Sequence, residues 1–196
     1  MKLIPVLLWL TLSMTMSIVY AGSFEDGMIA FHAGDYKKAM EIWSPLAEEG
    51  EVEAQVKLGI MHTNGLGVRR NGGEALKWFH KAAEKGNAEA EYYLGKLYGT
   101  QQSGVEMDQN ESTKWYRKAA EDGNADAQYA MGAKYFKGEG LPMDYVMGYA
   151  WMDVAARQGH YAAPNYRDLI ALILSTEDIA KAKALSDELA KKYGHL

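Results

Sequence analysis

The sequence predicts an all-α protein, an α/α solenoid of antiparallel helix pairs that follows an N-terminal signal peptide. Three observations indicate this fold: an internal repeat, an apolar stripe with helical spacing in each copy, and glycine and capping residues where the predicted helices end. The chain has 196 residues, a length that suits one short solenoid.

The repeat is defined by a short segment that recurs at a nearly constant interval. WFHKAAEKGNAEA at residues 78–90 corresponds to WYRKAAEDGNADA at residues 115–127. Two weaker copies of the segment end at positions 50 and 159. The glycines that end the four copies thus fall at positions 50, 86, 123 and 159, in steps of 36, 37 and 36 residues. This period is typical of helical repeat arrays. The predicted units span residues 24–50, 51–86, 87–123 and 124–159, and a C-terminal capping hairpin spans residues 160–192.

The first 21 residues have the pattern of a secretory signal peptide. Lys2 precedes an uncharged, mainly apolar stretch that runs to Val19, and small residues lead to Ala21. We therefore expect cleavage between Ala21 and Gly22, a periplasmic or secreted protein, and no membrane span after cleavage. An uncleaved anchor remains the alternative, because a stretch of this length could nearly cross a bilayer.

Within each unit, the first helix should bury residues spaced by four, such as Ala90, Leu94 and Tyr98. A glycine recurs in the middle of this helix at a cost of about 1 kcal/mol relative to alanine, so we expect a neighbouring helix to approach closely there. The second helix carries an apolar stripe around one tryptophan. We expect the equivalent tryptophans Trp78, Trp115 and Trp151 to be mostly buried.

The ends of the predicted helices have characteristic residues. Gly86 and Gly123 can adopt the left-handed conformation that closes a helix, and Asn87 and Asn124 follow them as N-caps of the next helix. The second helix of each unit should begin after a turn or capping residue, namely Asn71, Asp108 and Asp144.

Composition and motifs exclude several classes of function. The net charge is −5 without a basic run, which argues against a nucleic-acid ligand. The chain has no cysteine, so it has no disulfide, thiolate metal site or cysteine nucleophile. Its five histidines lack the spacing of a zinc site, and the serine motifs of common hydrolases are absent. We therefore expect neither a cofactor nor an enzymatic activity.

Three motifs resemble those of the Sel-one-like repeat, a relative of the tetratricopeptide repeat. They are LGKLY at residues 94–98, the Gly-x-Gly-Val turn at residues 65–68, and A-x-x-W-x-x-x-A-A-E-x-G at residues 75–86. The resemblance covers about residues 24–192. It implies an adaptor for protein complexes without family-wide catalytic residues, which in exported bacterial members serves envelope assembly, host interaction or signalling. A cell-wall-directed hydrolase is the alternative, and the lack of cysteine weakens the analogy with cysteine-rich relatives that carry a β-lactamase label.

Positions that differ between units indicate where a partner protein could bind. On the first helix, the positions three, six and seven residues after the shared alanine lie on one face and change from unit to unit. We expect them to contact the partner on the concave side of the solenoid. The predicted partner-binding residues are Lys57, Met61, Tyr93, Lys96, Leu97 and Lys134. Alternatively, Met61 and Leu97 pack against the neighbouring unit. Tyr92 and Tyr129 occupy equivalent positions, which favours core packing over a cofactor site.

Overall fold

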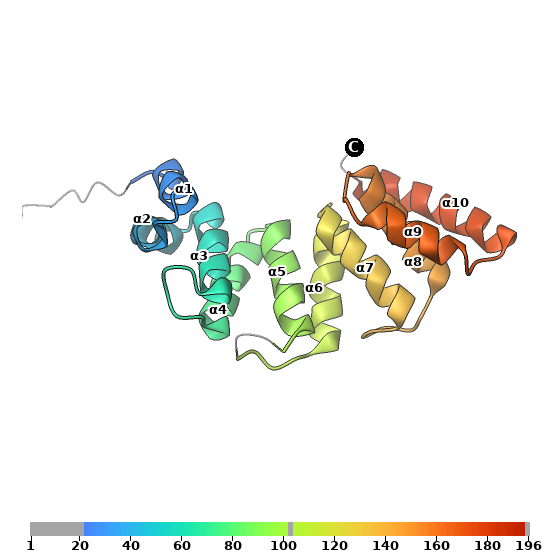
Figure 1. The fold of residues 1–196 in the computed structure, drawn as a ribbon, viewed down its shortest axis with the longest axis horizontal. Helices are drawn as coiled ribbons and strands as arrows, with labels where there is room; N and C mark the ends of the chain where they lie inside the picture. Colours follow the sequence, from blue (N-terminus) through green and yellow to red (C-terminus); the bar gives the residue numbers. More distant parts are fainter. Residues whose placement is uncertain (1–21, 102–103, 195–196) are drawn as a thin grey trace, which may run out of the picture.

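The computed structural model describes residues 22–101 and 104–194. The predicted signal peptide, residues 1–21, lies outside the described residues. In the described part, ten helices follow one another in consecutive pairs (Figure 1). The pairs are α1 (Phe24–His32) and α2 (Tyr36–Glu49), α3 (Val52–Asn64) and α4 (Gly72–Ala83), α5 (Ala88–Gly99) and α6 (Gln109–Glu121), α7 (Ala125–Lys137) and α8 (Tyr145–Arg157), and α9 (Ala163–Ala171) and α10 (Thr176–Tyr193).

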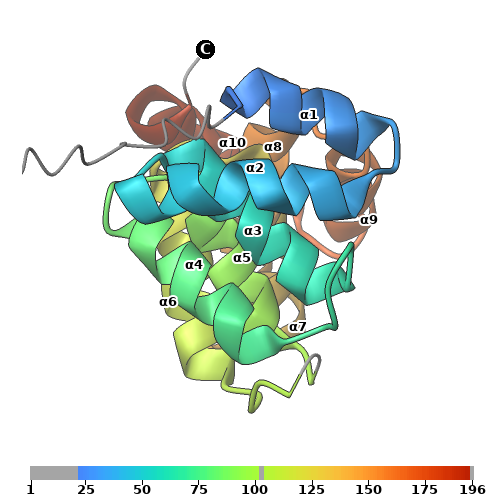
Figure 2. The same cartoon turned by 90° about the vertical axis from the view of Figure 1, so that its left-hand side faces the viewer.

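The pairs form an elongated array, and each helix from α2 to α7 packs on the helices before and after it in the chain. Figure 2 looks onto the α1–α2 end, with the later pairs stacked behind it. At the other end, α9 and α10 both pack on α8, and α10 also touches α6. The predicted all-α solenoid is therefore confirmed. None of the described helices combines the length and the apolar character needed to cross a membrane.

The predicted helix boundaries correspond to observed caps. Gly86 and Gly123 have φ angles of 79° and 86°, in the left-handed region. The side-chain oxygens of Asn87 and Asn124 accept the backbone N–H groups three residues later, at 2.9 and 2.8 Å. The same contact begins the second helix of three units, with Asn71, Asp108 and Asp144 as acceptors. These local contacts determine where each helix starts and stops.

The glycines in the middle of the first helices lie against large side chains of the second helices, which are aromatic rings in two of the three units. A Cβ atom on Gly59 would stand 2.5 Å from the ring of Phe79, and one on Gly95 would stand 2.6 Å from the ring of Tyr116. The predicted close approach is therefore confirmed, and it brings the two helices of a unit together around an aromatic ring.

The three equivalent tryptophans differ in burial. Trp78 and Trp151 are 7% and 4% exposed, whereas Trp115 is partly exposed. Tyr193 of α10 stacks on Trp151 with ring centroids 6.0 Å apart, whereas the ring beside Trp115 is the polar, half-buried His80 at 5.3 Å. All three tryptophans are therefore mostly buried, as expected, and Trp115 is the most exposed of them.

Candidate functional site

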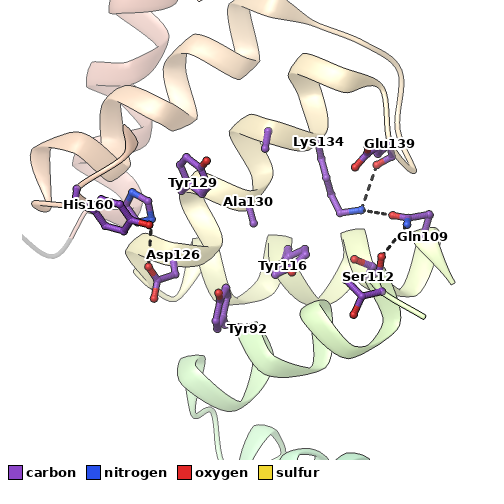
Figure 3. Close-up of a pocket in the computed structure, with 14 residues that line it drawn as sticks. Tyr92, Gln109, Ser112, Tyr116, Asp126, Tyr129, Ala130, Lys134, Glu139 and His160 are labelled. Atoms are coloured by element: carbon purple, nitrogen blue, oxygen red, sulfur yellow. Dashed lines mark hydrogen bonds and ion pairs between the residues drawn. The ribbon is translucent and has the colours of Figure 1, made fainter. Parts of the chain in front are cut away.

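A hollow of about 450 Å³ opens between α5, α6, α7 and the turn that leads into α9 (Figure 3). Its middle is aromatic, and its two ends are polar and differ in charge. One end carries His160 and Asp126, and the other carries Lys134, Gln109 and Glu139. The hollow is therefore built by successive elements of the array, from α5 to the turn that precedes α9.

The middle of the hollow consists of tyrosines from three successive helices. Tyr92 of α5 and Tyr116 of α6 have ring centroids 5.8 Å apart, and Tyr129 of α7 completes the row. Burial, together with a hydrogen bond to Tyr166, raises the pKa of Tyr129 to about 12, so its hydroxyl stays protonated. These residues are half-buried: they pack on the core clusters and also line the hollow. The interpretation of Tyr92 and Tyr129 as core residues was therefore incomplete.

The acidic end of the hollow is organised by His160. Its Nδ1 accepts the backbone N–H of Ala163 at 3.2 Å, the contact that Asn124 makes one unit earlier. A neutral ring that accepts through Nδ1 carries its proton on Nε2, which lies 3.3 Å from the Asp126 carboxylate. The ring also stacks on Tyr129 with centroids 4.3 Å apart. Capping and stacking together hold this end of the hollow in shape.

The basic end of the hollow is organised by Lys134, which is only 5% exposed. Its ammonium donates to the side-chain oxygen of Gln109 at 2.8 Å and to the backbone oxygen of Glu139 at 3.3 Å. The Gln109 amide nitrogen in turn donates to Gly99 at 3.1 Å, which fixes the orientation of the amide. Burial lowers the pKa of Lys134, and the charge of Glu139 partly opposes this shift.

Three of the predicted partner-binding residues are accessible at the surface. Lys57 is half-buried and lines a second hollow of about 210 Å³ together with Phe24 and Met28. Lys96 is exposed, and Tyr93 is half-buried because its ring stacks on Phe79 at 5.0 Å. Tyr93 therefore also supports the fold, and its truncation would disturb more than a binding surface.

Met61 and Leu97 are core residues, so including them in the partner surface was wrong. They are 0% and 2% exposed. Met61 packs in a cluster with Trp43 and Trp78, between α2 and α4, and Leu97 packs in a cluster that includes Phe79. The position seven residues after the shared alanine thus faces the second helices. Lys134 occupies the same position in α7, and it is buried as well but reaches the hollow.

In one unit, the first-helix face that was predicted to bind a partner lines the main hollow. In α7 the three variable positions are Ala130, Ala133 and Lys134, and all three line it. Sequence reasoning missed His160, and it missed Tyr92 and Tyr129, which lie two residues after the shared alanine. A signal existed for the tyrosines, because that position also varies, with Val56 where the later units have tyrosine. No repeat pattern indicated that the turn at His160 closes the hollow.

The geometry of the hollow favours binding over catalysis. Ser112 lies at the opposite end from His160, so these two side chains do not form a nucleophile and its base (Figure 3). The Ser112 hydroxyl instead donates to the backbone oxygen of Gly95 at 2.8 Å. The described residues contain no group of three acidic or histidine side chains that could hold a metal ion. That the chain is not an enzyme stays a prediction.

Comparisons with known proteins identify the repeat. The family model described as the Sel1 repeat matches residues 52–87, 88–124 and 125–160. A crystal structure of a Sel1 repeat protein from Oxalobacter formigenes is 30% identical, with a TM-score of 0.69, and the match covers 84% of this chain and 67% of that one.

Two curated relatives match over shorter segments. DAP3-binding cell death enhancer 1 of Rattus norvegicus is 37% identical over 70 residues, which are 36% of this chain and 14% of the relative. The ERAD-associated E3 ubiquitin-protein ligase component HRD3A of Arabidopsis thaliana is 32% identical over 82 residues, which are 41% of this chain and 12% of the relative. The matches therefore span only a small part of these longer proteins.

Proposed function

We propose that this chain, which belongs to the Sel1 repeat family, is a scaffold that binds a partner protein in the hollow between α5, α6 and α7. Sel1 repeats typically mediate protein–protein interactions, and these solenoids offer an extended surface rather than a preorganised catalytic group. The observation that carries the proposal is the row of half-buried tyrosines along the hollow. Aromatic side chains are enriched in the cores of protein interfaces.

Apolar surface continues from the hollow onto α9. The ring of Tyr166 lies 5.4 Å from that of Tyr129 and is 41% exposed. Tyr161 and Leu169 are 90% and 49% exposed. Exposed apolar patches of this kind mark interaction sites. The surface favours a partner larger than a small molecule, because a small molecule in the hollow would leave the exposed side chains of α9 uncovered.

The names of the curated relatives agree with a scaffold. One is named for binding DAP3, and the other is named as a component of a ubiquitin-ligase assembly. We carry over only the general property that such a chain binds another protein. We propose that the partner acts in envelope assembly, host interaction or signalling, the roles that the family resemblance implies.

We further propose that the protein is exported, on the basis of the signal-like pattern of residues 1–21. The expected product begins at Gly22 or within a few residues of it. Intact-mass measurement of the protein recovered from the producing cell checks this, and a mature protein that retains Met1 would contradict export with cleavage.

The binding proposal is tested by selecting ligands from a library of random peptides with the purified protein and mapping them by mutation. Ala130→Tyr places a ring in the hollow, and the helix should accept it because Tyr93 occupies the equivalent position in α5. We expect this variant to weaken the selected peptides at least about tenfold, which corresponds to about 1.4 kcal/mol.

Lys57→Tyr is the matched control, because it introduces the same side chain at the same repeat position outside the main hollow. It should leave peptide affinity unchanged, and both variants should keep the melting temperature of the wild type. Peptides that bind equally well to wild type and Ala130→Tyr would overturn the proposal, as would a selection that enriches no peptide.

A further inference from the structure

Three charged residues are buried in the described part of the chain, and one of them lacks an ion-pair partner. Glu91 has the ammonium of Lys118 at 2.6 Å from its carboxylate. Asp153 has the guanidinium groups of Arg157 and Arg167 at 2.8 and 3.0 Å. Lys134 has no carboxylate oxygen within 4 Å among residues 22–101 and 104–194, so it differs from the other two.

The acceptors that Lys134 does have are neutral. They are the side-chain amide oxygen of Gln109 and the backbone oxygen of Glu139. The Glu139 carboxylate does not pair with Lys134. It lies 3.7 Å from the ammonium of Lys137 at the surface. An ammonium has three N–H groups, and these two acceptors leave one of them for a ligand.

The repeat does not require a lysine at this position. The equivalent residues in the preceding units are Met61 and Leu97, which are buried and apolar. Burying a charge without a counter-charge is unfavourable, whereas methionine at the same position would contribute apolar burial. A buried cation that the repeat does not require, placed at the end of an aromatic hollow, is suited to pairing with an anion that enters from outside.

We propose that the Lys134 end of the hollow binds a carboxylate of the partner, either an Asp or Glu side chain or the C-terminus of the partner chain. The proposal rests on the proposed function, because it names the chemistry that the same hollow recognises. Lys134 supplies the charge, and the half-buried ring of Tyr116 lies 5.9 Å from the ammonium. A carboxylate there would accept a charge-assisted hydrogen bond from the buried ammonium, and such bonds are stronger than those between neutral groups.

The first test uses the wild-type protein and the peptides that it selects. We expect those peptides to contain an acidic residue or to require a free C-terminus. Each selected peptide is resynthesised with its acidic side chain changed to the amide, and separately with its C-terminus amidated. One of the two changes should weaken binding at least about tenfold, and which change does so identifies the source of the carboxylate.

The second test asks whether Lys134 is the group that recognises the carboxylate. Lys134→Met introduces the residue that the repeat has at Met61, so the helix should retain its packing. This variant should bind the acid and amide forms of a peptide about equally, because the charge that distinguishes them is gone. Lys137→Met removes an exposed lysine one turn later in α7 and should keep the preference of the wild type.

The outcomes separate this inference from the proposed function. If Ala130→Tyr abolishes binding but the wild type binds acid and amide peptides equally, the hollow binds a partner and the carboxylate proposal is wrong. If Lys134→Met keeps the full preference for the acid form, another group recognises it and the proposal is also wrong. If Lys134→Met fails to fold, the peptide comparison on wild type still decides the question.

Discussion

At the scale of single residues, one buried polar position ties successive units together. Gln55 and Gln128 are equivalent and almost fully buried. The side-chain amide of Gln55 donates to the backbone oxygen of Ala47 at 2.9 Å, and that of Gln128 donates to Ala120 at 3.1 Å. Both carbonyls lie in the last turn of the preceding helix, where acceptors lack intrahelical partners. The contact therefore joins these two units to the units before them.

The middle unit has Glu91 at this position, and a carboxylate has no proton to donate to the equivalent carbonyl of Ala83. Burial raises the pKa of Glu91, the neighbouring Asp122 adds to the increase, and Lys118 only partly opposes it. The loss of hydration thus outweighs an ion pair at 2.6 Å whose lysine is half-exposed.

We predict that Glu91→Gln stabilises the protein by about 1 kcal/mol at neutral pH. The amide can donate to the Ala83 carbonyl and removes a buried charge, while the lost ion pair with half-exposed Lys118 contributes little. Urea unfolding followed by circular dichroism measures the change. Glu84→Gln, at an exposed position in the same repeat, should have no effect.

The sign of the pH dependence gives a second check on Glu91. Because its folded pKa lies above the usual 4.5, the folded state retains the proton at pH values where the unfolded chain has lost it. The contribution of Glu91 to stability therefore falls as the pH rises from 4.5 through the folded pKa. The advantage of Glu91→Gln should grow over this interval. An advantage that does not change with pH, or a less stable variant, would contradict the assignment.

At the scale of helices, glycine and ring pairs determine how closely the two helices of a unit pack. Gly59 and Gly132 occupy equivalent positions, and the residues against them, Phe79 and Met152, are equivalent too. The repeat thus keeps glycine wherever the second helix presents a large side chain. This pairing explains why a residue unfavourable in helices recurs in the middle of three of them.

We predict that Gly59→Ala destabilises the protein by roughly 1–3 kcal/mol, the usual cost of overpacking. The added methyl would lie 2.5 Å from the ring of Phe79, and this clash exceeds the helix-propensity gain of about 1 kcal/mol. Gly73→Ala is the matched control in the exposed first turn of α4, where the nearest atom would lie 3.4 Å away. It should be neutral or stabilising, and chemical unfolding of both variants checks the contrast. Equal effects would mean that Gly59 has room for a methyl group.

At the scale of the whole molecule, the last three helices are joined by one buried carboxylate. Asp153 of α8 accepts the hydroxyl of Ser186 in α10 at 2.6 Å. Arg157 of α8 donates to the same oxygen at 2.8 Å, and the other carboxylate oxygen accepts Arg167 of α9 at 3.0 Å. Burial alone would raise the pKa of Asp153, but these hydrogen bonds and charges hold it below its usual value. The end of the solenoid is therefore closed by a polar network as well as by apolar packing.

We predict that Asp153→Asn costs on the order of 3 kcal/mol at neutral pH, because it removes the buried carboxylate with which Arg157 and Arg167 both pair. Thermal or urea unfolding measures the loss. Asp168→Asn is the control, since its side chain is 68% exposed and pairs with Arg167 at the surface, so it should cost little.

The contribution of Asp153 to stability should change with pH in the opposite direction to that of Glu91. The folded pKa of Asp153 lies below the usual 3.8, so its contribution is present above that pH and is lost as the pH falls through the folded pKa. The difference between wild type and Asp153→Asn should therefore shrink in acid. A difference that persists at the lowest pH at which the protein folds would contradict the electrostatic explanation.

The sequence by itself determined the features that depend on neighbours within one unit. The period, the helix ends and the glycine contacts all follow from residues a few turns apart, such as Asn87 and Gly95. Local hydrogen bonds and side-chain volume decide them, and the central units repeat these contacts with few changes. This is why the all-α solenoid and its caps could be predicted from the repeat.

The tertiary structure alone decided which side chains remain accessible. Helical spacing placed Met61, Leu97 and Lys134 on a variable face, but the angle at which the second helices pack buried all three. The same stacking left Tyr92 half-buried and brought His160, from the turn at the end of the last matched repeat, to the edge of the hollow. The period specifies one unit at a time, whereas accessibility depends on how successive units are rotated and stacked, and that geometry arises only when the whole array is assembled.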